Sequence, residues 1–548
     1  MEGFLDQKRR LRGPWQAFER AIARLFVHKG FKNVDLVGGV NDKGADVICS
    51  TDKLDYIIQV KFSKGHEEKK EIVYDVQRAM DYYDIENGIC ISNKVLSSGQ
   101  LKKLDKAKKS GYNITASTAG TLTDEFNRLP EFAVEPYNPR PYQTTAIASL
   151  INSYDSGDSK GLVCLATGLG KTYVAGKFLK HLYEKHEDFH VLILAHTVLL
   201  LEQFDKAIWK FLPKSVSTHL LNDQEKPSYS DGVIFSTFQS MINFVKKKEL
   251  YFDLVIVDEA HHAAAYTFKR LLDAISPKYK LGLTATPFRM DKQSITPIFG
   301  EPLINYDIYD GLKNGYLSEV NYILKNDNID VNWISENSKK GYTVKQLNKR
   351  VFIDQRDKAL CNDIRDQWNY YKRKRGILFC NSVNHALKIE KLMRSDFGIS
   401  IASITARIEK REIAKRMNYF RKGKLQMVTV FDMFNEGIDV PDVDFISFMR
   451  VTHSRTYFLQ QLGRGLRFKE GKKLRVLDYV ADIRRIGAVK KIESEINFKD
   501  RGSEHLELDK GFEVAFSNES TAHFLDLVTR DKSENLAEYS EKDTIIIK

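Results

Sequence analysis

The stretch that most constrains this chain is GLVCLATGLGKTYVAGKFL, in which an apolar run, a glycine-rich loop and a helical pattern follow one another directly. Gly168 and Gly170 allow the backbone N–H groups of a tight loop to close around phosphate oxygens at the start of a helix. Lys171 then reaches the β and γ phosphates of a nucleoside triphosphate, and Thr172 offers its hydroxyl to Mg²⁺. The stretch therefore predicts a buried strand that leads into a helix, with an ATP site between them.

An acidic motif further along the chain supplies the groups that this loop lacks. DEAHHA, from Asp258 to Ala263, comes directly after the apolar run FDLVIV, where a buried strand would end. Asp258 would bind Mg²⁺ there, and Glu259 would orient or deprotonate the attacking water, as phosphoryl transfer requires. Taken alone, these acids could equally be the polar end of a strand that meets solvent. Their combination with the glycine loop favours the nucleotide site.

Apolar runs separated by helical patterns continue through the chain after residue 141. They include HVLILA, GVIFST and LGLTAT, and then GILFCN, ISIASI, MVTVFD and VDFISFM. Runs that are apolar on both faces and separated by helices indicate parallel sheets covered on both sides. Because the pattern occurs twice, we expect two α/β domains, over residues 142–320 and 321–490.

A cluster of prolines marks a boundary before these domains. The stretch LPEFAVEPYNPRP holds four of the 12 prolines in the chain. Each proline fixes its own φ and pushes the preceding residue toward extended conformations, so residues 131–141 are predicted to form a semi-rigid linker. Residues 1–130 would then form a separate domain. Residues 491–548 carry no recognisable site and are interpreted as a C-terminal accessory segment.

Eight short motifs stand in a fixed order in the region after the linker: RPYQ, ATGLGKT, STFQS, DEAH, LTATPFR, ILFCNS, FNEGIDVP and QQLGRGLR. Over about residues 137–490 they resemble the DEAH-type helicases and translocases of superfamily 2, and most of all the motor subunits of type I and type III restriction enzymes. The resemblance implies two RecA-like domains that close on ATP. Leu165 stands where the general GxxxxGK motif has its first glycine, a departure that is common in this superfamily.

The resemblance also implies roles for residues of the second domain. Arg464 and Arg467 would reach the γ-phosphate held by the first domain, and Gln460 belongs to the same motif. Gly437 and Asp439, together with Glu436, match the element that couples nucleotide to nucleic acid. All of these except Glu436 are predicted to contact ATP.

For two residues of the first α/β domain, two interpretations remain open. Gln143 resembles the adenine-reading glutamine of the family, although a glutamine that caps the following helix would give the same pattern. His261 either bridges the two domains or is a polar turn residue. Thr284 to Thr286 resemble the element that links hydrolysis to strand movement.

The N-terminal block contains a second constellation of polar residues. An apolar stripe at helical spacing, from Ala17 to Phe26, has Glu19 beside it. The runs ADVICS and YIIQVKF, separated by TDKLD, predict a β-hairpin. If the hairpin turns about residues 52 and 53, Asp46 lies opposite Gln59, while Lys61 shares the face of Gln59.

This convergence has a chemical use. Asp46 and the carbonyl of Gln59 offer hard oxygen ligands to Mg²⁺, and Lys61 can polarise a water for attack on a phosphodiester. The polar solvent face of an edge hairpin would show the same spacing, so the spacing alone leaves both interpretations open.

A longer pattern, FERAIARLF, GF, GADVI, IIQVKF and GICISN, resembles the Mrr-like branch of the PD-(D/E)xK restriction endonucleases across nearly the whole block. The resemblance implies that Glu19, Asp46, Gln59 and Lys61 are catalytic residues. Gln59 replaces the glutamate of the wider superfamily, as is usual in this branch. Because a neutral ligand attracts the metal less strongly, an inactive domain that only binds DNA remains an alternative.

The amino-acid composition indicates which binding partners and which cellular environment to expect. The formal net charge of +12 favours a polyanion, and we expect DNA, double- or single-stranded. The five cysteines are odd in number and form no CxxC pair, which is typical of a reducing cytoplasm. The start MEGFLDQKRR has no apolar signal region, and the most apolar run is too short for a membrane span, so no membrane insertion is expected. A protein partner or a homo-oligomer is left open.

The sequence therefore predicts an α/β protein with an N-terminal restriction-endonuclease-like domain and two RecA-like parallel-sheet domains. Its predicted function is an ATP-dependent DNA helicase or translocase joined to an Mg²⁺-dependent DNA endonuclease, in restriction or antiphage defence. Two alternatives remain: a helicase-nuclease of DNA repair or recombination, and a DNA-binding remodeller whose nuclease domain is inactive.

Overall fold

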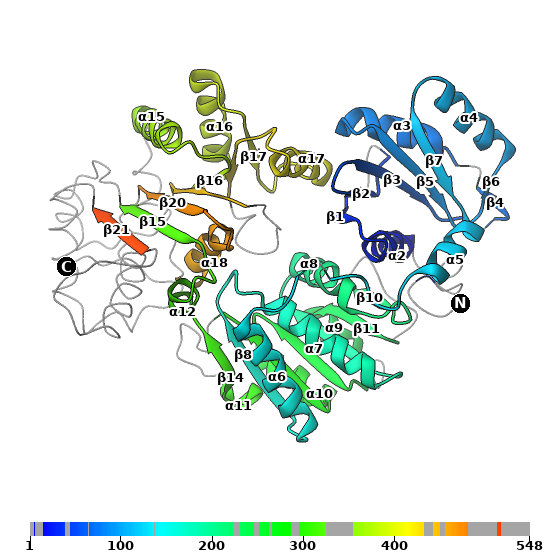
Figure 1. The fold of residues 1–548 in the computed structure, drawn as a ribbon, viewed down its shortest axis with the longest axis horizontal. Coiled ribbons are helices and arrows are strands. Elements are labelled where there is room, and N and C mark those ends of the chain that lie inside the picture. Colours follow the sequence, from blue (N-terminus) through cyan, green and yellow to red (C-terminus); the bar gives the residue numbers. More distant parts are fainter. Residues whose placement is uncertain are drawn as a thin grey trace. The chain divides into compact units, whose positions relative to one another are not determined.

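The computed structural model describes most of the chain, in these ranges: residue 5 and residues 15–38, 44–63, 65–68, 70–135, 137–222, 231–245, 251–261, 266–285, 295–324, 354–431, 442–449, 455–479 and 512–516. They form one five-stranded sheet and two seven-stranded sheets, each accompanied by helices (Figure 1). The chain divides into two compact units, of which the first holds the five-stranded sheet and the first seven-stranded sheet. No described helix has both the length and the apolar composition that a membrane crossing requires.

The five-stranded sheet belongs to the N-terminal block, and its strand order is β1-β2-β3-β5-β7. The pairs β1–β2 and β2–β3 are antiparallel, whereas β3–β5 and β5–β7 are parallel. A small parallel pair, β4–β6, lies outside this sheet. The strands and helices are β1 (Lys32–Leu36), β2 (Val47–Ser50), β3 (Asp55–Lys61), β4 (Glu67–Glu68), β5 (Asn87–Ser92), β6 (Val95–Leu96), β7 (Asn113–Ser117), α2 (Trp15–His28), α3 (Ile72–Tyr83), α4 (Ser98–Lys109) and α5 (Ala119–Arg128).

The predicted hairpin register is confirmed. Val47 pairs with Ile58 and Ser50 pairs with Asp55, and the turn is closed by a hydrogen bond from the Thr51 N–H to the Leu54 carbonyl, at 2.8 Å. This register places residue 46 opposite residue 59.

Helices cover both faces of strand β3. Phe18 and Ile22 of α2 share an apolar cluster with Val60, so α2 covers the face on which the even-numbered residues of β3 lie. Val76 and Met80 of α3 lie against Gly88, whose strand partner is Ile57. Because paired residues on neighbouring strands share a face, α3 covers the odd-numbered residues of β3, including positions 59 and 61.

The first seven-stranded sheet has the order β10-β11-β9-β12-β13-β8-β14. The pairings between β10, β11, β9, β12 and β13 are parallel, and β9 is buried at every residue, as predicted for strands covered on both faces. The elements are β8 (Lys160–Leu165), β9 (Val191–Ala195), β10 (Thr218–Leu221), β11 (Val233–Thr237), β12 (Leu254–Asp258), β13 (Tyr279–Thr284), β14 (Pro302–Tyr306), α6 (Pro141–Asp155), α7 (Lys171–Lys185), α8 (Val198–Ile208), the 3₁₀-helix η1 (Trp209–Phe211), α9 (Phe238–Val245), α10 (Tyr266–Ile275), α11 (Thr296–Phe299) and α12 (Ile308–Lys313).

The second seven-stranded sheet has the order β17-β18-β16-β19-β20-β15-β21, and all of its described pairings are parallel. The segment expected to be a C-terminal accessory segment contributes the edge strand β21, which pairs with β15. The elements are β15 (Glu319–Leu324), β16 (Gly376–Phe379), β17 (Ile401–Ile404), β18 (Met427–Val430), β19 (Phe445–Phe448), β20 (Lys473–Asp478), β21 (Phe512–Phe516), α15 (Asp354–Tyr370), α16 (Val383–Phe397), α17 (Lys410–Arg421) and α18 (Arg455–Leu466).

Within the first unit, two cations join the N-terminal block to the first seven-stranded sheet domain. Arg24 of α2 is 1% exposed, and its guanidinium donates to the backbone carbonyls of Val216 and Pro213, at 2.7 and 2.8 Å. In the opposite direction, Lys214 Nζ donates to the carbonyl of Leu129, at 2.8 Å, beyond the end of α5. The buried Arg24 is thus bonded by backbone carbonyls, as a buried cation requires, and the half-buried Lys214 is bonded in the same way.

The apolar part of the same contact centres on Trp209 of η1. Its side chain is 1% exposed and belongs to the apolar cluster of the N-terminal block, together with Phe18 and Phe26. The indole Nε1–H donates to Asp205 Oδ1 at 2.6 Å. One residue of the first seven-stranded sheet domain therefore completes the core of the N-terminal block.

This contact predicts a large stability effect for Trp209→Ala. Removing a buried tryptophan leaves a cavity, so we expect a loss of about 3–5 kcal/mol in the free energy of unfolding of the N-terminal block. Urea unfolding followed by circular dichroism checks this. Trp15→Ala, at a tryptophan that is 48% exposed, is the matched control and should cost less than about 1 kcal/mol. Equal losses in the two variants would contradict the contact.

Candidate active sites

Two carboxylates converge at the start of the β2–β3 hairpin. Asp46 is 2% exposed, and its Oδ2 accepts hydrogen bonds from the Val60 N–H, at 2.6 Å, and from the Gln59 amide. Its Oδ1 faces Gly38: a Cβ at that glycine would lie 3.1 Å from Asp46 Oδ1 and 3.0 Å from Glu19 Oε2. The oxygens of Glu19 and Asp46 therefore border one small space, which any side chain at position 38 would fill.

Gln59 adds a third oxygen to this site. Its side chain is 2% exposed, and its Nε2 donates to Asp46 and, at 3.3 Å, to the Val60 carbonyl. Its Oε1 is buried and has no hydrogen-bond partner within the described residues. A buried oxygen without a partner is costly unless a ligand binds it.

This donor set fits a divalent cation that prefers oxygen ligands. Glu19, Asp46 and Gln59 would hold the cation. Over the described ranges there is no group of three or more His, Cys, Asp or Glu residues suited to a metal. This site has only two carboxylates, and its third oxygen belongs to an amide. The sequence had assigned the metal to Asp46 and Gln59 and had placed Glu19 among the catalytic residues.

Lys61 lies at the end of β3, on the face that α3 covers. Its Nζ is 2.8 Å from Asp75 Oδ2, and Asp75 is a residue of α3. Sequence reasoning missed Asp75 because its spacing from Lys61 follows no local periodicity.

The glycine loop between β8 and α7 has the backbone that its sequence demands. Gly168 and Gly170 have φ of +92° and +86°, in the left-handed region that glycine adopts without strain. Helix α7 begins at Lys171, so Thr172 is its second residue. The loop therefore ends at a helix N-terminus, where backbone N–H groups can bind phosphate.

The acidic motif lies beside this helix start. Asp258 ends β12, and burial together with the neighbouring carboxylate of Glu259 raises the pKa of Asp258 to about 7. Glu259 Oε1 is 3.5 Å from Lys171 Nζ, and Glu259 Oε2 is 3.4 Å from His261 Nδ1. The carboxyl groups of Asp258 and Glu259 thus lie close to the single ammonium of Lys171. A bound Mg²⁺ would add positive charge beside these two carboxyl groups.

His261 and Gln143 both have defined contacts within the first seven-stranded sheet domain. His261 Nδ1 is 3.2 Å from Thr284 Oγ1, so the histidine connects the acidic motif to the end of β13. Gln143 Oε1 accepts from the Arg140 N–H at 2.9 Å and so caps the start of α6, a contact that the capping interpretation expects and that leaves the adenine-reading role a prediction. Its Nε2 also lies against the glycine loop, because a Cβ at Gly170 would be 2.7 Å from it.

The predicted ATP-contacting residues of the second sheet domain are partly described. Arg464 lies on α18, as does the backbone of Gln460, and Arg467 follows that helix. Gly437 and Asp439, like Glu436, lie outside the described residues. The Ser318 hydroxyl donates to the Arg467 carbonyl at 2.8 Å, so the segment that enters β15 is bonded to the arginine motif.

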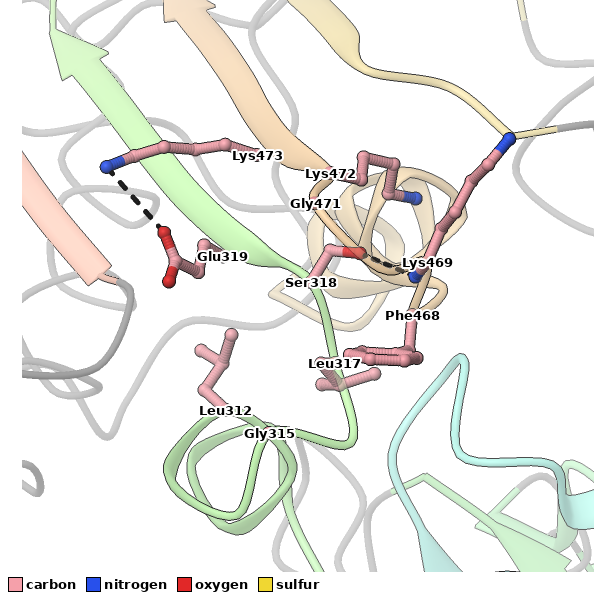
Figure 2. Close-up of a pocket in the computed structure, with 10 residues that line it drawn as sticks. All are labelled: Leu312, Gly315, Leu317, Ser318, Glu319, Phe468, Lys469, Gly471, Lys472 and Lys473. Carbon is pink, nitrogen blue, oxygen red and sulfur yellow. Dashed lines mark hydrogen bonds and ion pairs between the residues drawn. The ribbon is translucent and has the colours of Figure 1, made fainter.

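A basic pocket of about 270 Å³ lies next to this motif, where β15 and β20 begin (Figure 2). Phe468, which is 48% exposed, lines it together with three lysines. Lys473 is 3.8 Å from Glu319, and the Lys469 N–H donates to Ser318 Oγ at 3.3 Å. Burial lowers the pKa of Lys472 to about 8. The sequence did not predict this pocket.

Three families match successive parts of the chain. Residues 11–122 match the family described as restriction endonuclease, residues 136–289 match the res subunit of type III restriction enzymes, and residues 336–469 match the conserved C-terminal domain of helicases.

Curated relatives match the helicase part of the chain. A protein of Schizosaccharomyces pombe, named as the mitochondrial ATP-dependent helicase irc3, is 30% identical over 363 residues, which cover 63% of this chain and 58% of that protein. The endonuclease subunit of the type I restriction enzyme EcoAI of Escherichia coli is 26% identical over 377 residues, covering 61% of this chain and 44% of that subunit. The chain spans about half the length of these relatives.

Among solved structures, the ATP-dependent type ISP restriction-modification enzyme LlaBIII bound to DNA shares the fold. It has a TM-score of 0.54 at 16% identity and covers 93% of this chain, which in turn spans 41% of that enzyme. The chain therefore combines a restriction-endonuclease domain with the two RecA-like domains of a helicase. Its helicase part is similar to the endonuclease subunit of a type I restriction enzyme.

The space in front of Gly38 predicts a sharp effect for a small substitution. In Gly38→Ala the new Cβ would press on the oxygens of Glu19 and Asp46, so metal-dependent DNA cleavage should fall by roughly 10-fold or more. Gly120→Ala is the matched control, because a Cβ there meets no atom within 4 Å. Cleavage rates of a plasmid at several metal concentrations check this. Wild-type cleavage by Gly38→Ala would contradict the proposed metal position.

Proposed function

We propose that this chain is an ATP-driven DNA translocase or helicase that carries a divalent-metal-dependent DNA endonuclease. The carboxylates of Glu19 and Asp46, which border one space, carry the nuclease half of the proposal, together with Gln59, whose amide is bonded to Asp46 and whose Oε1 has no partner within the described residues. The motor half is supported by the glycine loop beside Asp258 and Glu259 and by the helicase families that match the chain.

At the nuclease site, a bound divalent cation would stabilise charge on the phosphodiester oxygens and activate a water. The chain's own residues would position these groups. Glu19 and Asp46 would supply the negative charge that holds the cation, and Gln59 its amide oxygen. Lys61 would place its ammonium beside the charge that develops on the phosphate.

At the ATP site, Lys171 would leave Glu259 for the β and γ phosphates when the nucleotide binds. Thr172 and Asp258 would hold Mg²⁺, and Glu259 would orient the attacking water. Arg464 and Arg467 would neutralise the charge of the transferred phosphoryl group. Gln143, already beside the glycine loop, would read the adenine.

The identity of the metal, the substrate and the biological setting are proposed from the chemistry of the residues and from the relatives. Mg²⁺ is proposed for both sites because both donor sets are oxygen atoms, which this ion prefers. DNA is the proposed substrate because the chain has a net charge of +12 and matches a restriction-endonuclease family. Restriction or antiphage defence, in the cytoplasm, is the proposed setting. A homo-oligomer or a partner protein would be consistent with relatives that are subunits of restriction enzymes.

A second candidate is a helicase-nuclease that trims intermediates of DNA repair or recombination. Relatives outside restriction systems favour it, since one is named as a mitochondrial helicase. Cleavage of unmodified phage DNA compared with branched or gapped DNA separates the two. Preference for branched or gapped DNA would replace the defence setting and leave both active sites unchanged.

Because the two proposed active sites are separate, a substitution in one site should remove its own activity without removing the other. Asp46→Ala and Lys61→Ala should abolish DNA cleavage and retain DNA-stimulated ATP hydrolysis, because they alter only the hairpin site. Lys171→Ala should abolish ATP hydrolysis and reduce cleavage in part. Cleavage of supercoiled, linear and single-stranded DNA, with and without ATP and Mg²⁺, checks this.

The controls for these variants lie on the same elements. Asp52→Ala changes an acid in the hairpin turn whose side chain is 78% exposed, and Lys185→Ala changes a lysine at the end of α7 that is 43% exposed. Both should behave as wild type. If Asp46→Ala cut DNA as well as wild type, the hairpin would be only a solvated face and the nuclease proposal would fail.

The arginine motif predicts a loss of turnover without a loss of nucleotide binding. Arg464→Ala and Arg467→Ala should each lower ATP hydrolysis by on the order of 10³-fold, because arginines of this kind act on charge in the transition state. Steady-state hydrolysis and equilibrium binding of a fluorescent ATP analogue measure the two effects. Arg394→Ala on α16, an arginine that is 60% exposed, is the control. Near-normal turnover in both variants would remove the assignment.

A further inference from the structure

Asp75 connects helix α3 to the hairpin that carries the nuclease residues. It lies in the first turn of α3, and its side chain is 17% exposed. Its backbone packs against Gly44: a Cβ at Gly44 would be 2.2 Å from the Asp75 carbonyl oxygen, and the φ of Gly44 is +90°. Only glycine allows this approach. The backbone at Gly44, two residues before Asp46, therefore packs directly against the backbone of Asp75.

The carboxylate of Asp75 bonds two cations, one with each oxygen. Oδ2 is 2.8 Å from Lys61 Nζ, and Oδ1 is 3.0 Å from Arg78 on the next turn of the same helix. Arg78 is 45% exposed, whereas the Lys61 side chain is only 21% exposed. The arginine faces solvent, and the lysine is held against the sheet.

Two physical needs of the nuclease site meet in this ion pair. A lysine side chain has many rotamers, and fixing its ammonium in one place costs conformational entropy unless a partner holds it. A divalent cation bound by Asp46 and Gln59 would also repel a nearby ammonium, because like charges disfavour one another. A carboxylate on the other side of the ammonium counters both effects.

We propose that Asp75 is a positioning residue of the nuclease, which holds the Lys61 ammonium on the face of β3 that carries Gln59. This inference rests on the proposed endonuclease function. Asp75 acts through Lys61 and is not itself a ligand of the metal or the DNA.

Single-turnover cleavage of plasmid DNA by the full chain tests the proposal, with DNA and Mg²⁺ each varied to saturation. In Asp75→Asn the maximal rate should fall by about 10- to 100-fold, as is usual when the partner that orients a site residue is removed. The DNA and Mg²⁺ concentrations that give half the maximal rate should change by less than about 3-fold. Asp75→Glu, which keeps the charge, should recover at least part of the rate.

Asp81→Asn is the matched control, because it makes the same change at an exposed acid on the same helix. It should leave cleavage unchanged, and DNA-stimulated ATP hydrolysis should be normal in all the variants. A wild-type cleavage rate in Asp75→Asn would overturn the proposal. So would a purely structural pattern, in which Asp75→Glu is as inactive as Asp75→Asn and thermal stability and DNA affinity fall in parallel. Absence of cleavage by the wild-type chain would instead remove the proposed function, and this inference with it.

Discussion

The hydrogen bond from the Val60 N–H to the Asp46 carboxylate is the contact on which the proposed nuclease site depends. It joins the acid that precedes β2 to the backbone of β3, so Asp46 cannot move without the strand that carries Gln59 and Lys61. A shift of the hairpin by one residue would move these side chains to the opposite face of the sheet. Such a shift would place Gln59 and Lys61 against the apolar cluster beneath α2, where their polar groups would lack partners, so it is unfavourable.

A second constraint fastens the nuclease domain to the first RecA-like domain. Arg24 and Lys214 cross the contact in opposite directions, and Trp209 fills the core of the nuclease domain from the helicase side. Opening the contact would expose the apolar surface around Trp209 to water and break these hydrogen bonds, so it is unfavourable. We infer that the nuclease domain moves together with the first RecA-like domain. The proline-rich stretch then only links the two domains along the chain. The contact formed by Arg24, Lys214 and Trp209 holds them together.

Local periodicity explains how much of this could be predicted. The alternation of residues in β3 and the turn at residues 52 and 53 define the hairpin register, so the position of Asp46 opposite Gln59 followed from the sequence. The glycine loop and the acidic motif were predictable because their residue types act within a few positions of one another.

Contacts between distant segments left no comparable signal. Arg24 and Val216 are far apart in the chain, and an arginine on an amphipathic helix usually faces solvent. Asp75 lies on α3, whereas Lys61 lies at the end of β3, so nothing in the local sequence links the two residues. Gly38 contributes to the site only because it has no side chain. Such roles depend on tertiary packing, which periodicity does not encode.

The position of the bound metal is the most direct test of the account. For this test the nucleotide-free protein is incubated with Fe²⁺ as the divalent cation, and ascorbate with peroxide then generates hydroxyl radicals that break the polypeptide near the ion. Mass spectrometry locates the breaks. We expect breaks close to Gly38, Asp46 and Gln59 that disappear in Asp46→Ala. Breaks that leave these residues intact, or that persist unchanged in Asp46→Ala, would contradict it.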